Sequence, residues 1–176
     1  MNSTIFLRAH TEILQKTKKR KRQKQDLPEP IWSPCALVFD CETRIDEKQC
    51  LTFGPYRIVF ADETGEYSNI REEGFFYEPQ EITPQETCEL QKFANHHNAE
   101  TAHDVSNELR IRTREEFLKE IFFPLAVNGA LIVGFNLPFD IARLAADARE
   151  ARRLNDDWSF VMLNEPFCPR IVVQSS

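Results

Sequence analysis

The sequence has few of the residues that disulfide frameworks, zinc knuckles and phosphate-binding loops require. Its five cysteines are odd in number and form no C-x-x-C pair, which argues against both a disulfide framework and a zinc knuckle. Its five glycines form neither a phosphate-binding loop nor a G-x-S-x-G motif. No apolar run approaches the roughly 20 residues of a membrane span, and the first residues lack the charge order of a signal peptide. We therefore expect a cytoplasmic protein with reduced thiols and no membrane partner.

The residues that are present fit one globular domain. The chain has 176 residues, of which 41% are hydrophobic and 14 are Phe, enough for a substantial core. Its net charge of −6 is unevenly divided, because residues 1–30 carry eight Lys and Arg against three Asp and Glu while the remainder is acidic. A basic segment attached to an acidic body suggests a nucleic-acid partner or a metal site.

Residues 1–33 are predicted to be a basic, flexible arm and linker, and residues 34–176 a single domain. Three interpretations remain open for the basic run of the arm: a solvated tail, an arm that contacts nucleic-acid phosphates, and a nuclear-import signal. The cations at the centre of this run are Lys18, Lys19, Arg20, Lys21 and Arg22.

Apolar runs bounded by turn residues predict the strands of one sheet. Three of them follow one another as an antiparallel meander and a fourth comes later: residues 35–43, 51–61, 68–77 and 130–135. Two further strand-like segments, residues 159–163 and 170–173, lie near the end of the sequence, and the last has no evident partner.

Capping boxes and helical periodicity predict three helices. They begin at Thr83 with Glu86, at Thr113 with Glu116, and at Leu137; the second ends near Asn128–Gly129 and the third near Arg153. The polar residues 96–112 are interpreted as a loop or a frayed helix. The expected fold is α/β, with a mixed sheet of three antiparallel strands and a parallel fourth flanked by helices.

Acidic side chains lie where the two most apolar strands end. Asp40 and Glu42 are two residues apart, so they project from one face of their strand, about 7 Å apart. Asp140 follows the later strand, in the first turn of the next helix. If the two strands are parallel neighbours, all three carboxylates meet at one edge of the sheet, where α/β proteins bind ligands.

Clustered carboxylates suit Mg²⁺ or Mn²⁺ and the hydrolysis of phosphodiesters by two metal ions. The structural alternative is that Asp40 caps a strand end and Asp140 a helix.

The order of these motifs resembles a known family. D-x-E on a first strand, followed about 100 residues later by N-x-x-F-D, is similar to motifs I and II of the DEDD 3′–5′ exonucleases of the ribonuclease H-like superfamily. The spelling from Asn136 to Asp140 most resembles the proofreading domains of family-B DNA polymerases, and the resemblance covers roughly residues 34–153. It implies a ribonuclease H-like sheet with two Mg²⁺ or Mn²⁺ ions. The residues that it implies are the catalytic metal ligands Asp40, Glu42 and Asp140, and at the substrate Asn136, with Phe139 packed beneath it.

The third motif of that family, Y-x-x-x-D or H-x-x-x-D, has no counterpart after Asp140, because Tyr77 and His103 are the last residues of their kinds. We therefore expect a domain that is incomplete at its C-terminus and lacks the fourth carboxylate. The expected function is that of a metal-dependent 3′–5′ exonuclease, or a fragment of one, acting on ends of single-stranded DNA, with RNA as a second substrate class. Two alternatives stay open: a non-catalytic nucleic-acid-binding module and an inactive remnant of the same fold.

Overall fold

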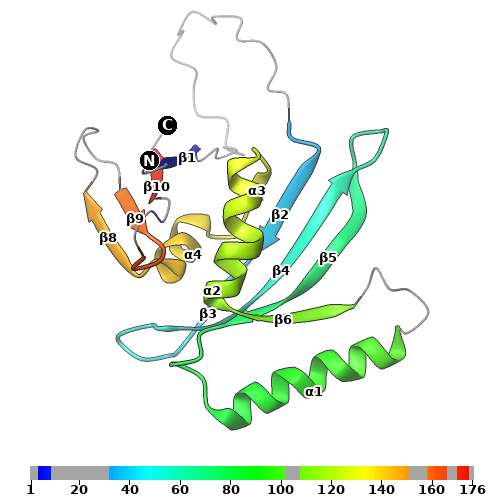
Figure 1. Cartoon of the computed structure of the whole chain (residues 1–176), viewed down its shortest axis with the longest axis vertical. Coiled ribbons are helices and arrows are strands. Elements are labelled where there is room, and N and C mark those ends of the chain that lie inside the picture. Colours follow the sequence, from blue (N-terminus) through cyan, green and yellow to red (C-terminus); the bar gives the residue numbers. More distant parts are fainter. Residues whose placement is uncertain (1–3, 9–31, 102–107, 151–157, 166–169, 175–176) are drawn as a thin grey trace, which may run out of the picture.

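The computed structural model describes residues 4–8, 32–101, 108–150, 158–165 and 170–174, which form two sheets and the helices between and beside them (Figure 1). The larger sheet has six strands in the order β6-β5-β4-β2-β7, with β3 paired to β4. Its strands are β2 (Cys35–Phe39), β3 (Glu42–Thr43), β4 (Leu51–Ala61), β5 (Tyr67–Tyr77), β6 (Leu109–Thr113) and β7 (Leu131–Val133). The smaller sheet has the order β1-β10-β9-β8. Its strands are β1 (Thr4–Arg8), β8 (Asp147–Glu150), β9 (Trp158–Val161) and β10 (Arg170–Gln174).

The predicted meander is confirmed in the larger sheet. Strand β2 pairs antiparallel with β4, and β4 pairs antiparallel with β5. Strand β7 lies on the other side of β2 and runs parallel to it, with Ala36 opposite Leu131. The three antiparallel strands and the parallel fourth are therefore present, and β6 extends the sheet beyond β5 as a further parallel strand.

Five helical segments accompany the sheets. They are α1 (Pro84–Glu100), α2 (Arg114–Glu116), the π-helical η2 (Phe117–Phe122), α3 (Phe123–Val127) and α4 (Leu137–Leu144). Both predicted capping boxes are present: the hydroxyls of Thr83 and Thr113 each accept from a backbone N–H three residues on, at 3.2 Å. Segments α2, η2 and α3 follow one another without a break and form one rod between the two sheets, whereas α1 lies beside β6 (Figure 1).

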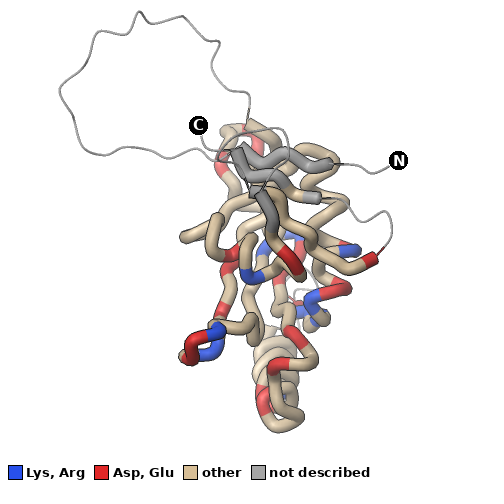
Figure 2. Tube along the Cα trace, turned by 90° about the vertical axis from the view of Figure 1, so that its left-hand side faces the viewer, with Lys and Arg blue, Asp and Glu red and all other residues tan. Residues whose placement is uncertain are grey.

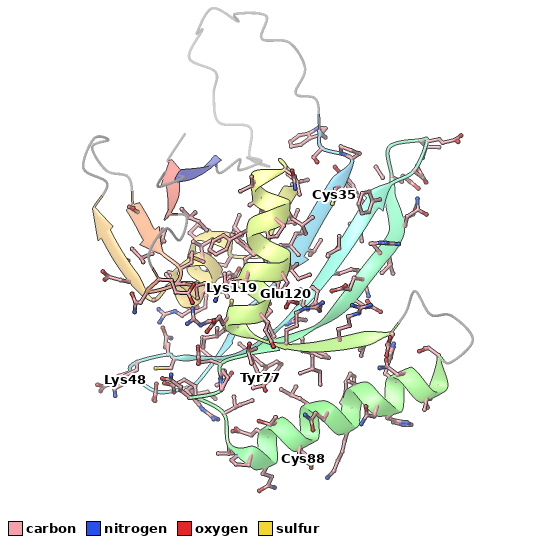
Figure 3. All side chains as sticks on the ribbon, viewed as in Figure 1. Cys35, Lys48, Tyr77, Cys88, Lys119 and Glu120 are labelled. Carbon is pink, nitrogen blue, oxygen red and sulfur yellow. The ribbon has the colours of Figure 1, made fainter. Side chains whose placement is uncertain are left out.

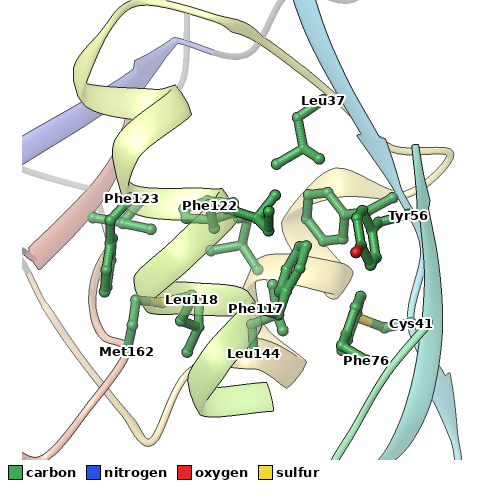
Figure 4. Packing of buried hydrophobic residues seen from close by; sticks show 14 of the residues in the cluster. Leu37, Cys41, Tyr56, Phe76, Phe117, Leu118, Phe122, Phe123, Leu144 and Met162 are labelled. Atoms are coloured by element: carbon green, nitrogen blue, oxygen red, sulfur yellow. The ribbon is translucent and has the colours of Figure 1, made fainter. Parts of the chain in front are cut away.

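The core is built on the aromatic side chains of this rod. Phe117 stacks on Phe76 with ring centroids 4.2 Å apart, and it also contacts Phe39 and Tyr56. Four of the six residues of η2 are buried: Phe117, Leu118, Ile121 and Phe122. Phe117 points toward the larger sheet, whereas Phe123 and Met162 lie on the other side of the rod (Figure 4). The rod therefore joins both sheets into one core.

Arg114, the first residue of the rod, connects distant parts of the chain. Its Nε donates to Glu78 at 2.6 Å, and its Nη1 donates to the main-chain carbonyls of Leu144 and Met162, both at 3.0 Å. Leu144 ends α4, so this arginine satisfies one of the carbonyls that a helix end leaves open. The same side chain thereby holds α4 and the smaller sheet to the end of β5.

Residues 96–112 were predicted to be a loop or a frayed helix, and this prediction is wrong at their C-terminal end. Helix α1 continues to Glu100, and Leu109–Thr113 form β6. Arg110 and Arg112 pair with Glu72 on β5, so a segment too polar to be identified as a strand gains its partners from the neighbouring strand. The side chain of Asn98 accepts from the N–H of Leu109 at 2.7 Å and donates to its carbonyl at 3.2 Å.

The third predicted helix ends earlier than expected. Helix α4 stops at Leu144, and Asp147–Glu150, which were predicted to be helical, form β8. The N–H of Ala146 donates to the carbonyl of Val161 at 2.8 Å, so hydrogen bonds to the strand β9 replace those of the helix.

The expectations for the two ends of the sequence also need correction. Strand β10, predicted to lack a partner, lies between β9 and β1. Residues 4–8, predicted as part of the arm, form β1 of that same sheet. The basic residues Lys18 to Arg22 lie outside the described residues.

Charged residues of both signs are interspersed along the described trace (Figure 2). Several of them form partly buried ion pairs on the larger sheet, including Arg57 with Glu73 and Arg112 with Glu72. None of the helices in the described part of the chain has the length and hydrophobicity that a bilayer span requires.

We predict that Phe117→Ala lowers the free energy of unfolding by about 3–5 kcal/mol, because it empties the centre of the aromatic core. The matched control is Phe93→Ala on α1, since that ring is 57% exposed and should cost less than about 1.5 kcal/mol. Urea denaturation followed by circular dichroism measures both losses. Equal losses for the two variants would contradict the central place of Phe117.

Candidate functional site

Two carboxylates meet at the carboxyl ends of β2 and β7. Asp40 directly follows β2, and Asp140 lies in the first turn of α4, the helix that follows β7. Because β2 and β7 are parallel neighbours, these ends share one edge of the sheet. Asp140 is only 1% exposed, whereas Asp40 is half-buried. The sequence predicted this juxtaposition of Asp40 and Asp140.

Among the described residues, no donor forms a full hydrogen bond with either oxygen of the buried Asp140 carboxylate. Burial raises the pKa of Asp140 from its ordinary value of 3.8 to about 6, and the nearby charge of Asp40 adds to the effect. The protonated acid can also hydrogen-bond to Asp40, which favours the neutral form further. The backbone N–H groups of Cys41 and Asn136 offset this only in part. Two acids held this way favour either a shared proton or a bound cation.

Small residues make room for the buried acid. A Cβ atom at Gly134 would lie 3.0 Å from Oδ2 of Asp140, so a larger residue there would press on the carboxylate. The thiol of Cys41 donates to the main-chain carbonyl of Asp140 at 3.6 Å. Cys41 is buried in the core, as predicted, and this burial raises the pKa of its thiol.

Glu42 stands apart from the pair. It is exposed and lines a groove between the β3–β4 hairpin and α1, whereas Asp40 lines the neighbouring groove between the sheet and α1. Burial alternates along this segment, with Phe39 and Cys41 in the core and Asp40 and Glu42 more exposed, so the two acids lie on the side of the chain that faces away from the core. Within the described residues, no group of three His, Cys, Asp or Glu side chains is arranged to hold a metal ion. The structure thus brings together two of the three predicted ligands.

The two predicted substrate residues differ in their surroundings. Asn136 is exposed at the N-cap position of α4, and its side chain makes no capping hydrogen bond with the described residues. Phe139 is half-buried beneath the guanidinium of Arg143, which lies 4.8 Å from the ring centroid. Contact of either residue with a substrate stays a prediction.

Two residues beside the acids were not identified from the sequence. Phe135 is fully exposed and lines the same groove as Asp40, a space of about 680 Å³. Arg143 follows Asp140 by three residues and therefore lies on the same side of α4. Two features of the sequence could have indicated them: Phe135 directly precedes Asn136, and helical spacing places Arg143 on the same side of the helix as Asp140. Neither feature shows by itself which residues of the fold lie next to it.

No family model matches the chain, and neither does any curated protein or solved structure. The chemistry of the site is therefore argued from its own residues.

The raised pKa of Asp140 predicts how stability depends on pH. Below about pH 4 the acid is protonated in both the folded and the unfolded chain, and it has no effect. Between about pH 4 and pH 6 the unfolded chain loses this proton first, so the folded state is progressively destabilised. Above pH 6 the penalty is constant.

We therefore expect Asp140→Asn to raise the free energy of unfolding at pH 7.5 by roughly 1–3 kcal/mol in metal-free buffer. At pH 4 the variant and the wild-type protein should be equally stable. Thermal unfolding across this range measures the difference, in which the other carboxylates cancel. A variant that is less stable than wild type at pH 7.5 would show that Asp140 is stabilised by a partner.

Proposed function

We propose that this chain is a metal-dependent 3′–5′ exonuclease, or the nuclease part of one, that acts on ends of single-stranded DNA. The observation that carries the proposal is the pairing of Asp40 with the buried carboxylate of Asp140, which accepts no full hydrogen bond from the described residues. Burying a charged carboxylate without a hydrogen-bond donor lowers the stability of the fold. An acid with a purely structural role would therefore be expected to have a donor beside it. A divalent cation removes that cost.

The position of the pair within the sheet supports the same proposal. The strand order β5-β4-β2-β7, with one acid after β2 and the other after β7, is compatible with a ribonuclease H-like arrangement. The resemblance of D-x-E and N-x-x-F-D to the DEDD exonucleases suggests the 3′–5′ direction and the single-stranded DNA substrate. RNA remains a second substrate class.

The residues present fit Mg²⁺ or Mn²⁺ because every donor is a carboxylate oxygen. Asp40 and Asp140 would hold the ion, whereas Glu42 stands apart from the pair in the adjoining groove. When bound, the ion would stabilise the charge that develops during phosphodiester hydrolysis and lower the pKa of a bound water. The chain itself contributes two anions held by β2 and α4 and an open groove beside Asp40 through which a strand end can approach.

The proposal predicts Mn²⁺-dependent shortening of a single-stranded oligonucleotide labelled at its 5′ end. Asp40→Asn and Asp140→Asn should each reduce the rate at least about 100-fold, because each removes a ligand of the ion. The matched control is Glu63→Gln, which neutralises an exposed acid in the β4–β5 turn and should leave the rate unchanged. Denaturing gel electrophoresis resolves the stepwise products.

A second readout separates metal binding from catalysis. Mn²⁺ should raise the unfolding temperature of the wild-type protein and of Glu63→Gln, but not of Asp140→Asn, because a ligand stabilises only the state that binds it. Stabilisation by Mn²⁺ without any shortening of the oligonucleotide would contradict an enzyme and favour a non-catalytic nucleic-acid-binding module. Neither stabilisation nor shortening would leave an inactive remnant of the fold.

A further inference from the structure

Arg143 connects the two chain segments that carry the acids. Its Nη1 donates to the main-chain carbonyls of Lys48 and Gln49, at 3.2 Å and 3.1 Å. These carbonyls belong to the β3–β4 hairpin, which follows Asp40 and Glu42 in the chain. Lys48 lies at the outer part of this hairpin (Figure 3). The arginine thus links α4 to the segment that leaves β2.

The guanidinium is also held from its own helix. It lies over the ring of Phe139, 4.8 Å from the centroid, so its plane is supported by an aromatic face. Its Nε is buried and has no acceptor among the described residues. A side chain that extended into solvent would expose this nitrogen. Its burial indicates that the guanidinium is held by packing as well as by the two carbonyls.

A second contact joins the same two segments on the inner side of the sheet. The thiol of Cys41 donates to the main-chain carbonyl of Asp140. Cys41 directly follows Asp40, and Arg143 follows Asp140 by less than one helical turn. Hydrogen bonds therefore connect the two segments on both sides of the paired acids: that of Cys41 in the core and those of Arg143 at the hairpin.

The hairpin itself has a backbone that needs such support. Gln49 has a φ of 47°, a left-handed conformation that is uncommon for residues other than glycine. On its other side, Arg44 holds the hairpin to the start of α1 through Glu86, at 2.6 Å. Arg143 supplies the corresponding connection to α4.

We infer that Arg143 is a positioning residue of the metal site, which holds α4 and the β3–β4 hairpin together so that Asp140 and Asp40 bind one cation. This inference rests on the proposed function. Arg143 does not itself contact either carboxylate among the interactions of the described residues, and it acts through the geometry of the two segments.

The other explanation for Arg143 is electrostatic. A cation in the last turn of α4 also favours the helix dipole. That effect needs only a positive charge, which lysine would supply equally well. A lysine ammonium could also donate to both carbonyls, because a single nitrogen of Arg143 makes both bonds. The inference needs in addition a planar group that packs on the ring of Phe139, which lysine lacks.

The test compares Arg143→Ala and Arg143→Lys with the wild-type protein and with the matched control Arg71→Ala, an exposed arginine on β5. The affinity for Mn²⁺ is measured by its effect on the unfolding temperature, without nucleic acid. Hydrogen exchange of a peptide covering residues 44–50 reports the state of the hairpin. Circular dichroism verifies that all four proteins fold.

We expect Arg143→Ala to weaken Mn²⁺ binding about tenfold, the scale typical of residues that orient metal ligands, and to accelerate exchange in residues 44–50. Arg143→Lys should bind Mn²⁺ more weakly than wild type, and Arg71→Ala should match wild type in both measurements.

Four results would overturn the inference. Unchanged exchange in Arg143→Ala would show that the arginine does not hold the hairpin. Faster exchange with unchanged Mn²⁺ affinity, or wild-type affinity in Arg143→Lys, would show that the link or the planar group is irrelevant to the metal, and the proposed function would survive. If the wild-type protein itself does not respond to Mn²⁺, the proposed function fails and this inference fails with it.

Discussion

The packing of Phe117 against the larger sheet is the interaction on which the rest of the structure depends. Its ring lies on Phe76 and contacts Phe39, the last residue of β2. Burial of these rings holds the rod against the sheet at the end of β2. Asp40 is the next residue, so the candidate site begins where this part of the core ends in the chain. The side of the sheet that faces the rod carries the aromatic core, and a groove lies between the sheet and α1.

The candidate site lowers the stability of the fold, and the packing of this core offsets that loss. A carboxylate as buried as that of Asp140, beside a second acid, opposes folding whenever it is charged. The protein keeps it because Gly134 leaves space for the side chain and Cys41 bonds the main chain beneath it. The cost is concentrated at one sheet edge, where a cation would remove it. This arrangement is typical of a site that is finished only by its ligand.

Sequence reasoning succeeded where the signal was local. Apolar runs identified β2 and β7, capping boxes identified the starts of α1 and α2, and the acids at the strand ends were found from their positions alone. It failed where distant residues decide the structure. Strand β6 depends on Glu72, far earlier in the chain, and α4 ends early because Val161 accepts from Ala146. Glu42 was expected beside Asp140, but the strand is interrupted between Phe39 and Glu42 and its register shifts in β3.

The outer edge of β6 has one more consequence. Asn98 offers Leu109 the donor and acceptor that a neighbouring strand would offer, and the carboxylate of Glu116 accepts from the N–H of Thr113. Two side chains therefore occupy backbone groups at both ends of β6. An unprotected edge invites strands from other molecules and starts aggregation. A strand from another molecule would have to displace both of these side chains before it could pair with β6. The amide of Asn98 and the carboxylate of Glu116 therefore oppose the addition of a further strand at this edge.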